Sequence, residues 1–162
     1  MEITFEPIGI IHSPFTELDE MPIQPTSETS TSGHIELYPE FTKGLKDLEG
    51  FSHIYLLYHF HKTPRARLHV KPFLDKDVRG IFATRAPSRP NPIGLSLVKL
   101  AGIDGNLVYV DNIDILNGTP LIDIKPYIPE FENPSSVRLG WLETATEKIS
   151  KMKSDRRFLD KS

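Results

Sequence analysis

The stretch of sequence that decides the fold is residues 93–112, IGLSLVKLAGIDGNLVYVDN. Two apolar runs, 93–103 and 107–112, flank the tripeptide Asp104-Gly105-Asn106. A short turn that contains Gly and Asn between two such runs is typical of a β-hairpin. We therefore expect the two runs to form adjacent antiparallel strands.

The same pattern of apolar runs separated by turn residues continues along the rest of the chain. It predicts an all-β domain, because short runs rich in β-branched and aromatic residues favour strands. The further strands are expected at residues 3–13, 33–38, 51–61, 67–71, 79–84, 121–125 and 136–141. The run at 51–61 is apolar on both faces, so we expect it to be central in the sheet or to lie at an interface.

Two segments depart from this pattern. Residues 16–32 are rich in Pro, Ser and Thr and have no period, which predicts a long N-terminal loop. From Leu142 onward apolar residues recur at helical spacing, which predicts a short C-terminal helix. The 162 residues fit one domain, with residues 1–141 as its body and 142–162 as its helix and tail.

Composition excludes several classes of function. The chain has no cysteine, which excludes disulfides, iron–sulfur clusters, cysteine-bound zinc and thiol nucleophiles. It has no Gly-x-Gly-x-x-Gly turn, so a Rossmann-type cofactor site is not expected. Neither a signal peptide nor a run of about 18 apolar residues is present, and we expect a soluble cytoplasmic protein.

The charges are distributed unevenly along the sequence. The net charge is −3, yet residues 61–99 hold nine basic residues against two acidic ones. Such a local basic segment suits an RNA partner, since phosphate binding depends on local charge. The alternative is that the segment folds beside acidic ones and is neutralised by them.

Within this basic segment, residues 80–94 read GIFATRAPSRPNPIG. Three prolines restrict their own backbone angles and those of the residues before them, so Arg85 and Arg89 are expected on a stiff loop. Preorganised guanidinium groups suit carboxylates and phosphates. A rigid connector with solvated arginines is the alternative.

Together with FSHI at 51–54 and TPLIDIKPY at 119–127, residues 80–94 resemble the TsaA-like family, over about residues 7–141. Its characterised members, named TrmO in bacteria, are S-adenosylmethionine-dependent methyltransferases that modify N6 of threonylcarbamoyl-adenosine at position 37 of tRNA. The resemblance implies a single antiparallel β-barrel that forms homodimers, with the cofactor near the subunit interface. It implies tRNA as the partner, and neither DNA nor a membrane.

The resemblance also implies the cofactor-binding residues. Carried over motif by motif, these are Pro22, Ile23, Gln24, His61, Lys62, Arg85, Leu95, Leu116, Asn117, Gly118 and Thr119. Asn117 stands where the family usually has aspartate, which replaces a charged acceptor by a neutral amide. We expect Arg85 to pair with the methionyl carboxylate, and the backbone of 116–119 to contact the adenine.

For methyl transfer, the protein must position N6 of the adenine and remove the proton from N6. The acid–base residues close in sequence to the expected site are Asp123, Asp114 and His61, and the sequence does not choose among them. Asp123 shares a strand face with Lys125, so an ion pair between them is the structural alternative. His59 and His61 lack an identifiable third ligand, and no metal site is expected.

The candidate RNA-binding residues are Arg65, Arg67, Lys71 and Arg89. Two other functions stay open: methyl transfer to a different substrate, and a non-catalytic RNA-binding or nucleotide-binding barrel. Longer bacterial relatives carry an additional C-terminal domain. We therefore expect this chain to recognise tRNA differently or to need a helper protein.

Overall fold

The computed structural model describes residues 1–18, 30–72 and 75–144. The chain divides into two compact units. The barrel unit comprises Met1–Arg67 and Pro87–Ile128, and the second unit comprises Leu68–Ala86 and Pro129–Ser162.

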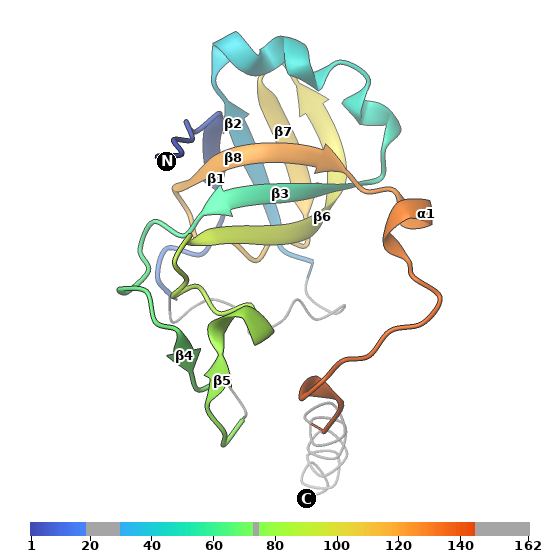
Figure 1. Ribbon diagram of the computed structural model, residues 1–162. Coiled ribbons are helices and arrows are strands. Elements are labelled where there is room, and N and C mark those ends of the chain that lie inside the picture. The colour runs from blue at the N-terminus through green and yellow to red at the C-terminus, as the bar shows by residue number, and fades with distance from the viewer. Residues whose placement is uncertain (19–29, 73–74, 145–162) are drawn as a thin grey trace, which may run out of the picture. The chain divides into compact units, whose positions relative to one another are not determined.

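The barrel unit is a closed antiparallel barrel of six strands in the order β1-β2-β7-β6-β3-β8, which confirms the predicted fold class (Figure 1). The strands are β1 (Gly9–His12), β2 (Ser32–Leu37), β3 (His53–His59), β6 (Ile93–Asp104), β7 (Leu107–Asp111) and β8 (Thr119–Pro126). The predicted hairpin joins β6 to β7, where Asp104 pairs with Leu107 and Gly105 adopts a φ of 59°. Glycine accepts this left-handed conformation without steric cost.

Pairing of β1 with β8 closes the barrel, with Gly9 opposite Leu121. On its other side β1 pairs with β2, and a Cβ at Gly9 would lie 2.5 Å from the carbonyl oxygen of Glu36. Glycine therefore permits the close approach of the two strands. β3 pairs with both β6 and β8, as every strand of a closed barrel pairs with two neighbours.

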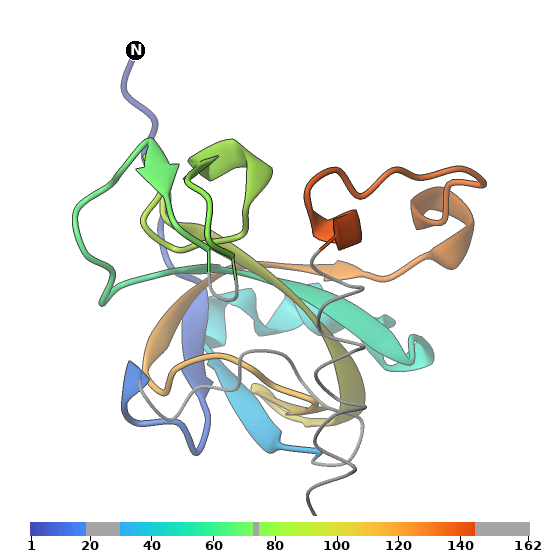
Figure 2. The same ribbon diagram turned by 90° about the horizontal axis from the view of Figure 1, so that it is seen from below.

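Side chains alternate between the barrel interior and its outer face, as the pleat of a strand requires. On β3, Ile54, Leu56 and Tyr58 are buried, while Tyr55 and Leu57 between them are half-buried. The buried residues of β1, β2, β6, β7 and β8 join them in one hydrophobic core. The view from below shows the strands around this interior (Figure 2).

Three of the expected strands differ from the structure. Residues 3–8 and 136–141 form no strand, because their apolar residues have no neighbouring strand to pair with. Residues 79–84 contain the two-residue strand β5 (Arg79–Gly80), followed by the 3-10 helix η4 (Ile81–Ala83). β5 pairs with β4 (His69–Val70).

In the part of the chain that the structure describes, helical segments are short. The 3-10 helices η2 (Pro39–Leu45) and η3 (Leu48–Gly50) connect β2 to β3, and α1 (Pro129–Glu132) lies in the second unit. The expected C-terminal helix is present at residues 142–144, and its continuation lies outside the described residues, as do residues 19–29 of the expected long loop. None of the described helices has the length and hydropathy needed to cross a membrane.

In the second unit, Trp141 joins the chain after α1 to the β4–β5 segment. Its indole Nε1 donates a hydrogen bond to the carbonyl oxygen of Ala83 at 2.8 Å. The guanidinium of Arg79 lies 5.3 Å from the centre of the Trp141 ring, within cation–π range. Asp75 holds Arg79 in place through a 2.8 Å ion pair.

Candidate functional site

A cavity of about 240 Å³ lies at the end of the barrel where β3 ends and β8 begins. We call it the Asp114 pocket. Segments far apart in the sequence form it: the end of β3 and the residues after it, the β7–β8 connection, and the single residues Leu18 and Pro87. Five of the predicted site residues line it, namely His61, Lys62, Asp114, Leu116 and Thr119.

The turn at 116–119 is fixed by its own hydrogen bonds. The hydroxyl of Thr119 donates to the carbonyl oxygen of Leu116 at 2.6 Å, and Gly118 has a φ of 81°. The backbone N–H groups of Asn117 and Gly118 donate to carbonyl oxygens of Phe15 and Ile11, at 2.7 and 2.8 Å. These two amides hold the turn to the N-terminal strand, so neither is available to the adenine.

The side chain of Asn117 has a structural partner as well. Its Oδ1 accepts a 3.0 Å hydrogen bond from the backbone N–H of Ser13. An aspartate oxygen would accept the same bond. The replacement of aspartate by asparagine therefore retains this acceptor and removes a negative charge beside the pocket.

A chain of two hydrogen bonds, the first to Ser96 and the second from Ser96 to Tyr58, links Asp114 to the barrel interior. The hydroxyl of Ser96 donates to Asp114 Oδ1 at 2.7 Å, and the hydroxyls of Ser96 and Tyr58 lie 2.9 Å apart. Burial raises the pKa of Tyr58 to about 12, although its hydrogen bond with Ser96 opposes the shift and the charge of Asp114 adds to it. Tyr58 is therefore protonated at neutral pH.

His61 is the second titratable group of the pocket. Partial burial lowers its pKa, and the neighbouring charges of Lys62 and His59 lower it further. The imidazole is therefore neutral at physiological pH and can accept a hydrogen bond or a proton.

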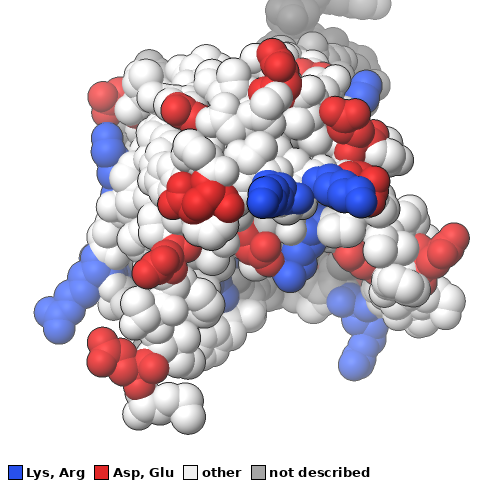
Figure 3. All heavy atoms as spheres, turned by 90° about the horizontal axis from the view of Figure 1, so that it is seen from above, with Lys and Arg blue, Asp and Glu red and all other residues white. Residues whose placement is uncertain are grey.

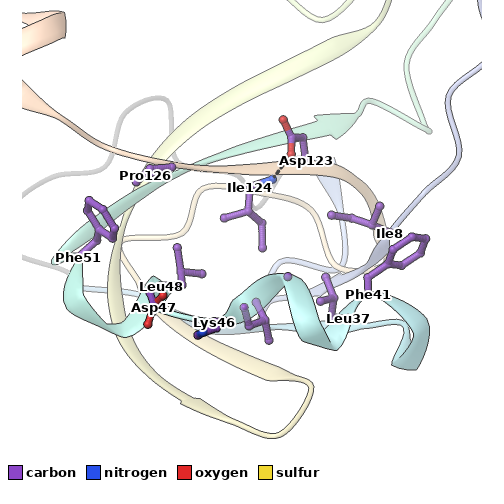
Figure 4. A pocket seen from close by; sticks show the side chains of 12 residues that line it. Ile8, Leu37, Phe41, Lys46, Asp47, Leu48, Phe51, Asp123, Ile124 and Pro126 are labelled. Carbon is purple, nitrogen blue, oxygen red and sulfur yellow. Dashed lines mark hydrogen bonds between the residues drawn. The ribbon is translucent and has the colours of Figure 1, made fainter.

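Asp123 lies at the opposite end of the barrel. Lys125 Nζ is 2.8 Å from Asp123 Oδ2, which confirms the expected ion pair. Asp123 lines a different cavity, of about 420 Å³, together with Phe41, Leu48 and Phe51 (Figure 4). We call this cavity the Phe41 pocket. Of the three acid–base candidates, the structure thus brings Asp114 and His61 together and places Asp123 apart.

Leu95, Arg85 and the three residues 22–24 are the predicted cofactor residues that remain. Leu95 is on the outer face of β6 with its side chain 52% exposed. Arg85 is exposed in the second unit, where the Thr84 hydroxyl accepts a hydrogen bond from the backbone N–H of Ala86 at 3.3 Å. Pro22, Ile23 and Gln24 lie outside the described residues.

The candidate RNA-binding residues fall in both units. Arg65 and Arg67 are exposed and Arg89 is half-buried in the barrel unit, while Lys71 is exposed in the second unit. The backbone N–H of Arg67 donates to the carbonyl oxygen of Ser88 at 3.0 Å, so the segments that carry Arg65, Arg67 and Arg89 are adjacent. At the end of the barrel covered by η2, basic and acidic side chains are interspersed (Figure 3).

No group of three or more potential metal ligands occurs among the residues that the structure describes. Tyr58, Phe60 and Ser96 also belong to the site and were not predicted from the sequence: Tyr58 and Ser96 come from the barrel interior, and Phe60 follows β3. One signal for Tyr58 was present in the sequence. Gly94 interrupts an apolar strand, and glycine in a strand often marks a close approach; here a Cβ would lie 2.2 Å from the Tyr58 ring.

Residues 10–133 match the family described as tRNA-methyltransferase O N-terminal domain. A probable S-adenosyl-L-methionine-binding protein of Pyrococcus abyssi is 51% identical over 156 residues, covering 96% of this chain and 85% of the relative. The human tRNA (adenine(37)-N6)-methyltransferase is 37% identical over 139 residues, covering 82% of this chain and 32% of the human protein.

Solved structures agree with this relationship. A crystal structure of TrmO superimposes with a TM-score of 0.74 at 39% identity, covering 86% of this chain and 64% of that one. TrmO from Pseudomonas aeruginosa gives a TM-score of 0.72 at 37% identity, covering 87% and 63% of the two chains. The chain thus spans less than two thirds of the length of these solved proteins. The chain belongs to the TrmO family, in agreement with the resemblance seen in its motifs.

Proposed function

We propose that this chain transfers a methyl group from S-adenosylmethionine to N6 of adenosine 37 in tRNA, and that this adenosine carries a threonylcarbamoyl group. The names of its relatives support the cofactor and the tRNA adenine. The observation that carries the proposal is the Asp114 pocket, where residues of the family's cofactor motifs lie beside two groups that can accept a proton.

The residues of the Asp114 pocket fit part of the cofactor. Thr119 and Lys62 are polar groups for its hydroxyls and carboxylate, and Tyr58 and Phe60 offer aromatic surface. The volume of about 240 Å³ is below the roughly 300 Å³ at which cavities for whole ligands of this size begin. One end of the cofactor is therefore expected to extend beyond this cavity.

A homodimer would supply that further surface. On the outer face of the barrel, Tyr55 and Leu57 of β3 pair with Leu97 and Leu95 of β6. The two leucines of β6 are 42% and 52% exposed. An outer sheet face is ordinarily polar, and an exposed apolar patch of this kind favours a second copy of the chain. The predicted cofactor contact of Leu95 would then be made across the interface.

The dimer is tested by replacing Leu97 with lysine and measuring the sedimentation of the protein at micromolar concentration. The variant is expected to be monomeric and the parent dimeric. Tyr109→Lys is the control, because Tyr109 is 39% exposed on β7 and pairs with Gly102 of β6, outside the group formed by Tyr55, Leu57, Leu95 and Leu97. A monomeric parent that methylates tRNA at full rate would contradict the dimer.

The tRNA is expected to lie along Arg65, Arg67 and Arg89 of the barrel unit, and Lys71 is a separate candidate for a phosphate contact in the second unit. We place this reaction in the cytoplasm as part of the proposal. Charge reversal at Arg65 and Arg67 should weaken tRNA binding and reduce its dependence on salt, because each phosphate contact releases counterions. The affinity for S-adenosylmethionine should not change, which separates the two binding surfaces.

The activity itself is tested with S-adenosylmethionine and tRNA purified from cells that lack this protein. Mass spectrometry of the nucleosides should show one added methyl group on threonylcarbamoyl-adenosine. Methylation of unmodified adenosine would retain the enzyme class and change the substrate. Cofactor binding without methylation of any nucleoside would favour a non-catalytic binding barrel.

A further inference from the structure

Ser96 is a buried hydroxyl, 6% exposed, on the inner face of β6. Among the residues that the structure describes, it and Thr119 are the buried polar residues other than tyrosine. Thr119 bonds within its own turn, whereas Ser96 connects two residues that line the Asp114 pocket. A buried hydroxyl needs hydrogen-bond partners, and the chemistry of those partners determines to which of them the hydroxyl donates its proton.

The direction of the hydrogen bonds follows from the number of protons. An ionised carboxylate accepts and does not donate, so Ser96 gives its single proton to Asp114 at 2.7 Å. Tyr58 must then donate to Ser96, at 2.9 Å. Two neutral donors in series thus end on Asp114, and they stabilise its charged form.

We propose that Asp114 is the general base that removes the N6 proton of the adenine, and that Ser96 and Tyr58 are positioning residues that hold its carboxylate. This inference rests on the proposed function. The bound cofactor supplies the methyl group, and its sulfur keeps the electron pair of the broken S–C bond. N6 forms the new N–C bond with its own electron pair and retains the electrons of its N–H bond. The proton passes to a carboxylate oxygen of Asp114 and then to water.

Asp114 is favoured over His61 by the charges around each group. Proton uptake by His61 would create a cation next to Lys62, whose charge already lowers the pKa of the imidazole. Proton uptake by Asp114 neutralises a charge. Ser96 and Tyr58 link Asp114 to the strands through their hydrogen bonds, and His61 and Lys62, from the segment after β3, line the same pocket.

The first test replaces Asp114 with asparagine, which keeps the shape of the side chain. The single-turnover rate of methyl transfer to tRNA from cells that lack this protein should fall about 10²-fold to 10⁴-fold, the usual contribution of a general base. The dissociation constant for S-adenosylmethionine, measured by calorimetry without tRNA, should change less than about threefold. A large loss of cofactor affinity with an unchanged rate at saturation would make Asp114 a cofactor ligand and overturn the proposal.

The second test concerns the positioning residues. Ser96→Ala removes the hydroxyl that holds the carboxylate of Asp114 in place, so the acidic limb of the pH–rate profile should move to higher pH. Tyr58→Phe should move it in the same direction by less.

The matched control is the exposed pair of Ser32 and Asp111, whose hydrogen bond is 2.6 Å long. Ser32→Ala and Asp111→Asn should leave the rate and the pH profile unchanged. If Ser96→Ala lowered the unfolding temperature without moving the pH–rate profile, the network would be structural. A wild-type protein that methylates no tRNA would overturn the proposed function. If the wild-type protein methylates tRNA and the Asp114→Asn variant does so at the same rate, this inference alone would be overturned.

Discussion

The two ends of the barrel each contain a cavity, and the proposed site of methyl transfer lies in the smaller one. The Phe41 pocket has about 420 Å³ and the Asp114 pocket about 240 Å³. The larger cavity is lined by Asp123, one of the three acid–base candidates, and this carboxylate is paired with Lys125. In the smaller one, Asp114 is held by a hydroxyl and lies with a neutral histidine. Volume therefore says less about function here than the partners of each polar group.

The difference has its origin in how the two ends are covered. The Phe41 pocket is enclosed by η2 and η3, which follow β2 directly in sequence and place Phe41 and Leu48 over the core (Figure 4). This is a local cap on a barrel end. The Asp114 pocket is formed by the chain after β1, after β3 and between β7 and β8. Loops that meet from separate parts of the sequence can each contribute a different chemical group.

A glycine at each end gives the largest expected contrast in stability. At Gly94 a Cβ would lie 2.2 Å from the Tyr58 ring, whereas at Gly44 it would meet nothing within 4 Å. Gly94→Ala should destabilise the protein by about 3 kcal/mol, because the ring and the strand must move apart. Gly44→Ala should be neutral or stabilise by up to about 1 kcal/mol. Urea unfolding measures both, and equal effects would remove the contrast.

The alkaline stability of the protein should depend on Tyr58. Its pKa rises from 10.0 in the unfolded chain to about 12 in the fold, mainly because the ring is buried. The folded state therefore binds this proton more tightly, and the stabilisation is fully present below pH 10. It should be lost as the pH rises through about 12, by roughly 2 to 3 kcal/mol.

The measurement for Tyr58 is the free energy of unfolding in urea between pH 8 and pH 12. Tyr58→Phe has no phenol to ionise, so its stability should fall less steeply over this range than that of the parent protein. Parallel curves for the two proteins would show that the phenol contributes no such linkage.

The sequence predicted the strands better than their closure. The hairpin at 93–112 was readable because its turn residues and apolar runs are local. The pairing of Gly9 with Leu121 joins the first and last strands of the barrel, β1 and β8, and no local sequence pattern encodes this pairing. The barrel was therefore expected from the family resemblance. Residues 136–141 have the apolar content of a strand, and the prediction was wrong because a strand also needs a partner.

The site was predictable where motifs are contiguous. Motif residues His61, Lys62, Leu116 and Thr119 lie together in the pocket. The choice between Asp114 and Asp123 was not available from the sequence, since both lie close to the same motif. Their separation depends on the course of β8, which begins at one pocket and ends at the other. Ser96 was missed because a serine within an apolar strand gives no sign of which hydroxyl or carboxylate it faces.

A lysine at each pocket offers a smaller contrast. Lys62 lines the Asp114 pocket and Lys46 the Phe41 pocket, and both are exposed. Lys62→Ala should weaken S-adenosylmethionine binding about fivefold, as expected for a solvent-exposed charge pair. Lys46→Ala should leave the affinity unchanged. Calorimetry with S-adenosylmethionine measures both, and a larger effect at Lys46 would place the cofactor at the other end of the barrel.

The smallest effect is expected at Asp123, and it is the strictest test of the comparison. Asp123→Asn removes the charge that Lys125 pairs with on the outer face of β8, where solvent screens the interaction and the pair contributes little. The single-turnover rate should stay within about twofold of the parent protein, because the proposed general base, Asp114, lies in the other pocket. The same assay is applied to Asp114→Asn. A loss of rate at Asp123 as large as that at Asp114 would mean that both ends of the barrel take part in the reaction, and the division between a structural end and a chemical end would be wrong.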